Sequence, residues 1–114
     1  MYCFKKLKLN SDFRRIYGRG KSLVAPAFVA YAFKGRTANV RLGITVTKKI
    51  GGAVERNRAK RLLTAAFYEV AGDISSGWEF VLVARTKILK TKSQDIAFTL
   101  REFFLKEGIM KKDA

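Results

Sequence analysis

The chain has 114 residues and carries 24 lysines and arginines against 9 aspartates and glutamates, a formal net charge of +15. It has no histidine and one cysteine, which excludes an intramolecular disulfide and chemistry that depends on histidine as ligand or base. No apolar run approaches the ~18 residues that span a bilayer, and no signal peptide is evident. We therefore expect one cytoplasmic domain over residues 1–114, with no membrane contact.

The positive charge is concentrated in the first half of the chain. Residues 1–61 hold 16 basic and 2 acidic side chains, whereas residues 62–114 hold 8 basic and 7 acidic ones. Charges that served only solubility would be spread more evenly. Self-repulsion at this density opposes the compact state, so the pattern indicates a polyanionic partner such as a nucleic acid.

The N-terminal segment predicts an extended stretch followed by a short helix. Residues 1–9 are basic and should be extended. Asn10 or Ser11 can cap a helix that Gly18 and Gly20 end. Its apolar residues follow helical spacing and are Phe13, Ile16 and Tyr17.

Strands are predicted next. Residues 27–33 have strand composition with apolar side chains on both faces, and residues 40–47 alternate between apolar and polar side chains. We expect these two strands to pair as a hairpin across a turn at residues 34–39. A third short strand is expected near residues 21–25.

The second half predicts helix, strand and helix. A helix over residues 54–71 carries a full amphipathic stripe, made of Ala59, Leu62, Leu63, Ala66, Phe67 and Val70. Residues 79–85 are apolar on both faces, which is typical of a buried central strand. A last helix over residues 91–107 should begin with a capping box between Thr91 and Gln94. The element order predicts a mixed α+β fold.

The first two turns of the 54–71 helix are unusually basic. They contain Arg56, Arg58, Lys60 and Arg61. Each cation near the positive end of the helix dipole costs about 0.3–1 kcal/mol, so a sequence tuned only for stability would place acidic residues there. The pattern predicts a phosphate-binding surface, although a merely solvated face remains the alternative. The polar side of the helix holds Asn57, Lys60, Arg61, Thr64 and Tyr68.

Aromatic residues form a second candidate site. Phe13 and Tyr17 on the first helix, with Val29 and Tyr31 on one strand face, could line a groove in which unpaired bases stack. Such stacking contributes about 1–3 kcal/mol per base. Aromatic residues at this spacing are at least as often core residues, so core packing is the competing interpretation.

One long block resembles a known family. The run RLGITVTKKIGGAVERNRAKRLL, which begins at Arg41 and whose likeness extends to Glu69, is similar to the signature of the bacterial ribonuclease P protein subunit. Its hallmark is the Arg-Asn-Arg run at residues 56–58. Residues 9–22 resemble the first helix of the family, and residues 77–85 resemble its last strand.

The resemblance implies a fold and a function. The fold would be α+β in the order α-β-β-β-α-β-α, with a four-stranded sheet and a left-handed β-α-β crossover. The holoenzyme would be an endoribonuclease that removes the 5′ leader of precursor tRNA by phosphodiester hydrolysis. Its RNA subunit would be the catalyst and hold most of the Mg²⁺, so this chain would supply no catalytic residue and bind no small-molecule substrate.

The resemblance also implies residue roles. Seven residues would contact the catalytic RNA: Lys48, Lys49, Arg56, Asn57, Arg58, Lys60 and Arg61. Four would form the groove for the single-stranded leader: Phe13, Tyr17, Val29 and Tyr31. The chain departs from the family at Thr64, where an arginine is common, and at Tyr68, where a basic or polar residue is frequent.

Other classes of function remain to be weighed. A ribosomal or RNA-chaperone protein would share the charge and the aromatic residues. A metal-dependent nuclease is disfavoured because the acidic residues show no paired spacing of a two-metal site. DNA binding through a recognition helix would need base-reading residues along the helix, whereas these cations crowd one end.

Overall fold

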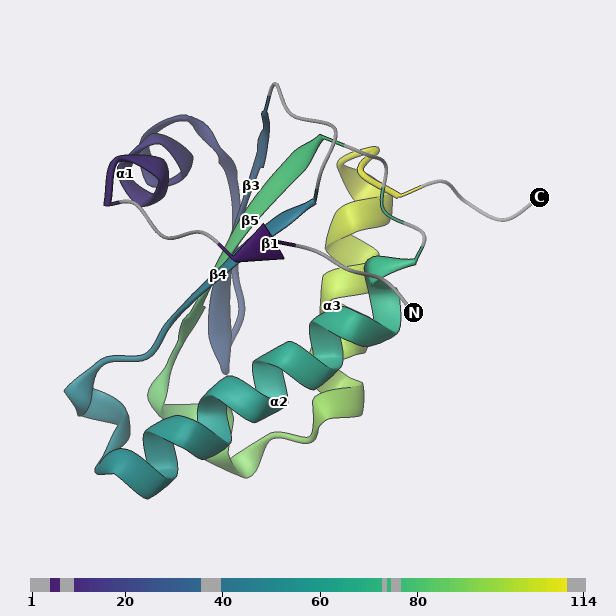
Figure 1. Cartoon of the computed structure of the whole chain (residues 1–114). Coiled ribbons are helices and arrows are strands. Elements are labelled where there is room, and N and C mark those ends of the chain that lie inside the picture. Colours follow the sequence, from purple (N-terminus) through teal and green to yellow (C-terminus); the bar gives the residue numbers. More distant parts are fainter. Residues whose placement is uncertain (1–4, 7–9, 36–39, 73, 75–76, 111–114) are drawn as a thin grey trace.

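Figure 1 presents the computed structural model, which describes residues 5–6, 10–35, 40–72, 74 and 77–110. The elements in chain order are β1 (Lys5–Lys6), α1 (Asn10–Arg19), β2 (Lys21–Val24), β3 (Phe28–Lys34), β4 (Arg41–Thr45), the 3-10 helix η1 (Lys48–Ile50), α2 (Ala53–Ala71), β5 (Trp78–Ala84), the 3-10 helix η2 (Thr86–Lys90) and α3 (Ser93–Lys106). Apart from the two-residue β1, this is the predicted α-β-β-β-α-β-α order, and the α+β fold class is confirmed. The side chains of the predicted caps Asn10 and Ser11 lie outside the described residues, and so do residues 36–39 of the turn predicted at 34–39.

The sheet has the strand order β1-β4-β5-β3-β2. Strand β4 runs parallel to β5, whereas β3 is antiparallel to β5 and β2 is antiparallel to β3. The expected short strand at residues 21–25 is thus confirmed as β2. The predicted hairpin of residues 27–33 with residues 40–47 is wrong, because β5 lies between β3 and β4. Strand β5 is almost completely buried, and the backbone groups of a buried strand need hydrogen-bond partners. The central position provides them, because β4 and β3 pair with its two edges.

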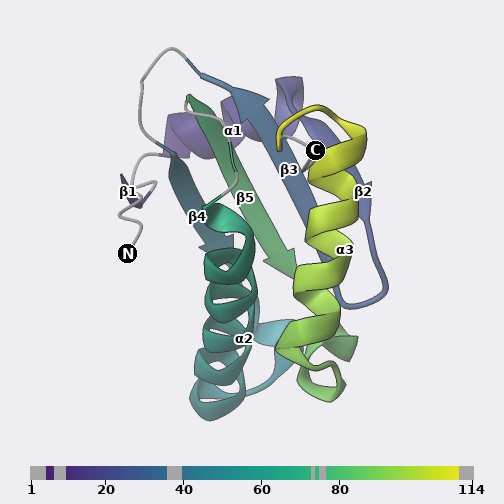
Figure 2. The same ribbon diagram turned by 90° about the vertical axis from the view of Figure 1, so that its right-hand side faces the viewer.

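The connection from β4 through α2 to β5 is left-handed. Figure 2 views the sheet from the side of α2 and α3: β4 and β5 both run downward, β5 lies to the right of β4, and α2 returns upward in front of them. This hand is opposite to that of most such crossovers. It agrees with the hand that the resemblance implies.

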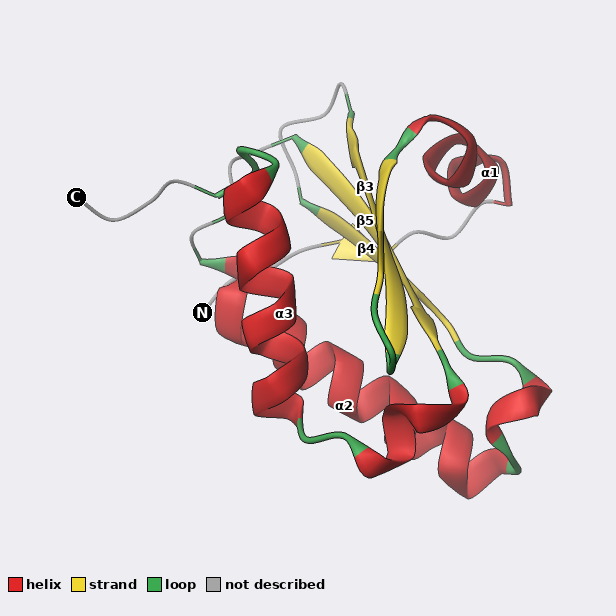
Figure 3. Ribbon diagram, turned by 180° about the vertical axis from the view of Figure 1, so that it is seen from behind, coloured by secondary structure: helices red, strands yellow, loops and turns green. Residues whose placement is uncertain are grey.

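The helices form two layers around the sheet, with α2 and α3 on one face and α1 on the other (Figures 1 and 3). The main core lies under α2 and α3, where the ring of Phe80 is 5.3 Å from that of Phe67 and 5.0 Å from that of Phe104. The predicted stripe of α2 faces this core, with Leu62 only partly buried. No helix in the described ranges is long and apolar enough to cross a membrane.

Helix α3 begins two residues later than predicted, and the capping box between Thr91 and Gln94 is wrong. The N-cap is Lys92, with no side-chain cap hydrogen bond. The Thr91 hydroxyl instead donates to the carbonyl of Lys87 at 2.8 Å. It is thus engaged by the preceding 3-10 helix η2, which the sequence patterns did not indicate.

Candidate RNA interface

Three rows of side chains cross the sheet face that α1 covers. The pairing register of β3, β5 and β4 aligns the rows Phe33–Glu79–Arg41, Tyr31–Val81–Gly43 and Val29–Val83–Thr45. Neighbouring rows are two residues apart along each strand, or about 6.6 Å. The alternation predicted for residues 40–47 is confirmed, because Leu42 and Ile44 pack on the main core and Arg41, Gly43 and Thr45 lie on the opposite face. On β3, Val29, Tyr31 and Phe33 alternate with the buried Phe28, Ala30 and Ala32.

Helix α1 lies over the middle row and separates the two outer ones. Ile16 is fully buried against Val81. On a helix, residues four apart share one side, so Phe13 and Tyr17 lie together to one side of Ile16. Arg15 and Arg19 lie together to the other side. We call these the aromatic flank, which includes Val29 and Tyr31 on β3, and the cationic flank.

The aromatic flank brings together the four residues of the predicted groove. The Tyr17 ring meets the Tyr31 ring edge-on at 4.8 Å and lies 6.4 Å from the Phe13 ring. Tyr17 is 38% exposed, and its hydroxyl is 3.2 Å from the Thr45 hydroxyl. Phe13, Val29 and Tyr31 are half-buried. Phe13 and Tyr31 pack against the small cluster under α1, as the core interpretation expects, whereas Tyr17 and part of the other rings remain open to solvent, as a groove requires.

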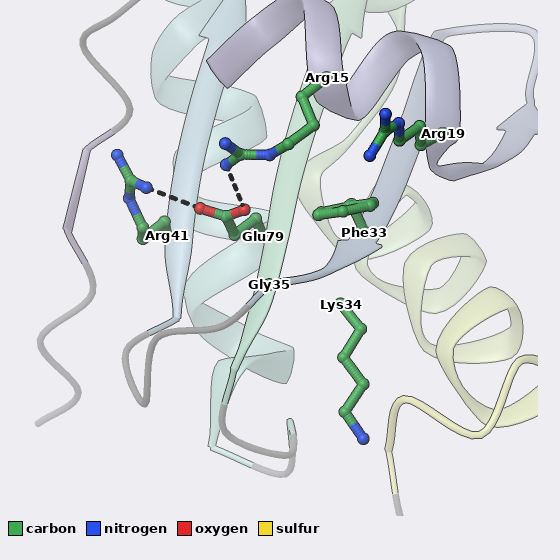
Figure 4. Close-up of a pocket in the computed structure, with 7 residues that line it drawn as sticks. All are labelled: Arg15, Arg19, Phe33, Lys34, Gly35, Arg41 and Glu79. Atoms are coloured by element: carbon green, nitrogen blue, oxygen red, sulfur yellow. Dashed lines mark hydrogen bonds and ion pairs between the residues drawn. The ribbon is translucent and has the colours of Figure 1, made fainter. Parts of the chain in front are cut away.

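The cationic flank contains a site that the sequence patterns did not reveal. Glu79, 1% exposed, accepts hydrogen bonds from Arg15 Nη2 at 2.8 Å and from Arg41 Nη1 at 2.7 Å (Figure 4). The Arg15 guanidinium also lies 5.5 Å from the centroid of the Phe33 ring. The only signal in the sequence was a lone carboxylate within an apolar strand.

The predicted contacts to a catalytic RNA lie elsewhere, on what we call the basic surface: Lys48, Lys49, Arg56, Asn57, Arg58, Lys60 and Arg61. Six of these side chains are exposed and Arg56 is half-buried. Lys48 and Lys49 belong to η1, and the others to the first turns of α2. The N-cap of α2 is Gly52, with no side-chain cap hydrogen bond. Backbone N–H groups at such an end, together with the helix dipole, favour an anion.

A glycine shapes the turn between η1 and α2. Gly51 has a φ of 143°, a conformation that side chains rarely adopt, and a Cβ atom there would lie 3.0 Å from the Glu55 side chain. The chain therefore turns sharply between the paired lysines and the helix. This turn places η1 and the start of α2, which carry the two sets of cations, at one end of the molecule (Figure 1).

The aromatic flank and the basic surface lie apart in the structure but near the same end of the sheet. Helix α1 and the aromatic flank lie on the opposite sheet face from α2. However, the row that contains Val29 also contains Thr45, the last residue of β4, and Lys48 follows three residues later. The aromatic flank thus opens toward the end of the sheet from which the chain leads into the basic surface.

The residues that depart from the family pattern continue the polar side of α2. Tyr68 is 46% exposed and Thr64 is half-buried. The predicted polar side of this helix, opposite the apolar stripe, is therefore confirmed.

The described residues offer little to a metal ion. They contain no group of three or more histidine, cysteine, aspartate or glutamate side chains that could hold one. Each carboxylate oxygen of the buried Glu79 accepts a hydrogen bond from an arginine. Both oxygens of Glu79 are therefore engaged by arginines, and a single carboxylate supplies too few oxygen ligands for a divalent cation.

These features define a small α+β protein of the RNA-binding class, with a basic helix end and an aromatic-lined sheet face. The family model for Ribonuclease P matches residues 1–107, and the chain belongs to this family. It is 35% identical over 107 residues to the ribonuclease P protein component of Bacillus cereus, covering 93% of both chains. It is 33% identical to that of Exiguobacterium sibiricum over 108 residues, covering 94% of this chain and 93% of the relative.

Solved structures agree with this assignment. The Staphylococcus aureus RNase P protein has a TM-score of 0.79 at 29% identity, with 96% of this chain and all of the other covered. The Thermotoga maritima RNase P protein has a TM-score of 0.73 at 31% identity, with coverage of 87% and 94%. Because the chain belongs to the ribonuclease P family, this assignment is preferred to the alternative of a ribosomal or RNA-chaperone protein.

Proposed function

We propose that this chain is the protein component of a ribonuclease P, an endoribonuclease complex that removes the 5′ leader from precursor tRNA. The observation that carries the proposal is the family match along nearly the whole chain, at 35% identity over 93% of both sequences. The proposed partners are the ribonuclease P RNA and precursor tRNA, and the proposed location is the cytoplasm.

The basic surface is proposed to bind the catalytic RNA. Its lysines and arginines, apart from the half-buried Arg56, are exposed and lie beside a helix N-terminus, where backbone N–H groups add to the attraction for phosphate. Each phosphate neutralised by a cation releases condensed counterions, so affinity should fall steeply with salt. In the complex, the negative charge of the phosphates would offset the unfavourable interaction between these cations and the dipole of α2.

The aromatic flank is proposed to bind the single-stranded leader. Tyr17 and Tyr31 are held edge-on at 4.8 Å and present partly exposed rings on which unpaired bases can stack. Because stacking tolerates any base, this flank suits leaders of different sequence. Since it opens toward the end of the sheet that leads to the basic surface, one RNA complex could engage both sites.

Hydrolysis itself is proposed to belong to the RNA subunit, which would hold most of the Mg²⁺. This chain would act by binding and orienting. In support, its buried carboxylate, Glu79, is engaged by two arginines rather than directed at a reacting phosphate.

The test is reconstitution with a bacterial ribonuclease P RNA and precursor tRNA at low Mg²⁺. We expect the protein to raise the rate of 5′-leader cleavage well above that of the RNA alone. The RNA without protein and the protein without RNA are the two controls. Absence of any gain, or cleavage of the precursor by the protein alone, would refute the proposal.

A further inference from the structure

A cavity of about 380 Å³ opens on the cationic flank, beside the buried Glu79. It is lined by Arg15 and Arg19 from α1, Phe33 and Lys34 from β3, and Arg41 from β4 (Figure 4). Cavities of about 300–1,000 Å³ are of the size that holds small organic groups. Helix α1 separates it from the aromatic flank, so it is a second opening on the same sheet face.

The carboxylate of Glu79 organises the residues that line the cavity. Gly35 borders it, and a Cβ atom at this position would lie only 2.8 Å from Glu79 Oε1. Any larger residue would therefore displace the carboxylate. Glu79 in turn fixes the guanidinium groups of Arg15 and Arg41 at 2.8 and 2.7 Å, which reduces the entropy lost when a ligand binds beside them.

The charge of the cavity is strongly positive. Four cationic side chains against one carboxylate leave a net charge of +3. Arg19 and Lys34 are exposed, and within the described part of the chain neither forms an ion pair. In Figure 4 the Arg19 side chain lies beside the Phe33 ring, and Lys34 extends away from the opposite side of the ring. An anion is the ligand that this arrangement would stabilise.

We propose that this cavity binds a phosphate group of RNA, at a site distinct from the aromatic flank. Guanidinium and ammonium groups supply the charge-assisted donors, and the Phe33 ring supplies an apolar wall for the adjoining nucleotide. The identity of the ligand as RNA rests on the proposed function. The phosphate can come from the leader beyond the aromatic flank or from the catalytic RNA.

The first test uses the protein alone and inorganic pyrophosphate, followed by NMR. Saturable shifts are expected at the amides of residues 15, 19, 33 and 34, and they should be lost in Arg19→Ala/Lys34→Ala. The matched control is Lys92→Ala/Lys106→Ala, which removes two exposed cations from α3 and its N-cap and should keep the shifts. No shift at the cavity, or equal shifts in both double variants, would overturn the proposal.

The second test uses the holoenzyme and separates the two sources of phosphate. For Arg19→Ala/Lys34→Ala, the salt dependence of binding should fall by about 0.7–0.9 per lost contact. A loss confined to precursors with long leaders assigns the phosphate to the leader, and a loss in binding of the catalytic RNA alone assigns it to that RNA. An unchanged salt slope for both, in a variant that unfolds at the wild-type temperature, would overturn the proposal.

Failure of this proposal differs from failure of the proposed function. If the cavity binds no RNA, the wild-type protein and the Lys92→Ala/Lys106→Ala control still raise cleavage at low Mg²⁺. If the proposed function fails, the wild-type protein itself gives no gain, and the pyrophosphate experiment still reports on the cavity.

Discussion

The aromatic flank and the basic surface differ in how their side chains are held. On the aromatic flank, Tyr17 contacts Tyr31 and Thr45, and Phe13 packs on the cluster under α1. On the basic surface, by contrast, the cations are almost all exposed, and those in the first turns of α2 oppose its dipole. The side chains of the aromatic flank are therefore held by contacts that also stabilise the fold. The cations of the basic surface make few contacts within the protein, so we expect their substitutions to affect RNA binding without lowering the free energy of unfolding.

The largest effect is expected from removing the carboxylate that ties α1 to the sheet. Glu79→Ala leaves two arginines facing each other beside a buried position, and should lower the free energy of unfolding by about 3 kcal/mol. The value lies at the low end of the usual range because the Arg15 and Arg41 side chains are 37% and 22% exposed. Urea denaturation measures it, with the exposed Glu102→Ala as control. A loss similar to that control would mean that the ion pairs do not secure α1.

The next effect tests the aromatic flank as a stacking surface. Tyr31→Ala should weaken binding to leader-bearing precursor by about 1–3 kcal/mol while leaving mature tRNA binding unchanged. Equilibrium binding of the holoenzyme to both RNAs measures the difference. Phe98→Ala, which removes a 66% exposed ring from α3, is the matched control. Equal losses on both RNAs would instead indicate a folding defect.

A smaller effect tests the basic surface as a source of charge alone. Arg58→Ala or Lys60→Ala should weaken catalytic-RNA binding and reduce the salt slope by about 0.9 for each phosphate contact. The free energy of unfolding should stay constant or rise by about 0.3 kcal/mol, because a cation leaves the helix N-terminus. Binding at several salt concentrations gives the slope, with Lys106→Ala as control. An unchanged slope would exclude the substituted residue as a phosphate contact.

The smallest effect concerns the departure from the family pattern. Thr64→Arg places a cation one turn beyond Lys60 on the polar side of α2, and should steepen the salt slope by at most about 0.9. Catalytic-RNA affinity should rise by a few-fold. The same salt titration measures this, with Thr99→Arg on α3 as control. If affinity and slope stay at wild-type values, position 64 lies outside the RNA contact.

Local patterns predicted most of the elements, and their failures share one cause. The apolar stripe of α2 and the alternation in β4 could be predicted because each pattern depends only on residues within one helix or strand. The hairpin of residues 27–33 with 40–47 was wrong because strand pairing depends on which strand is most buried, here β5. The capping box at Thr91 failed because the preceding 3-10 helix η2 takes its hydroxyl.

The sequence by itself determined the α+β class, the two-faced character of α2 and, through the Arg-Asn-Arg block, the family. These follow from periodicity, charge and order along the chain, which are local properties. Only the tertiary structure decided that β5 separates β3 from β4, that the four predicted groove residues lie on one flank of α1, and that Glu79 joins Arg15 to Arg41. The last contact spans 64 residues for Arg15 and 38 for Arg41. Contacts at such separation arise when the core closes and leave no periodic trace in the sequence.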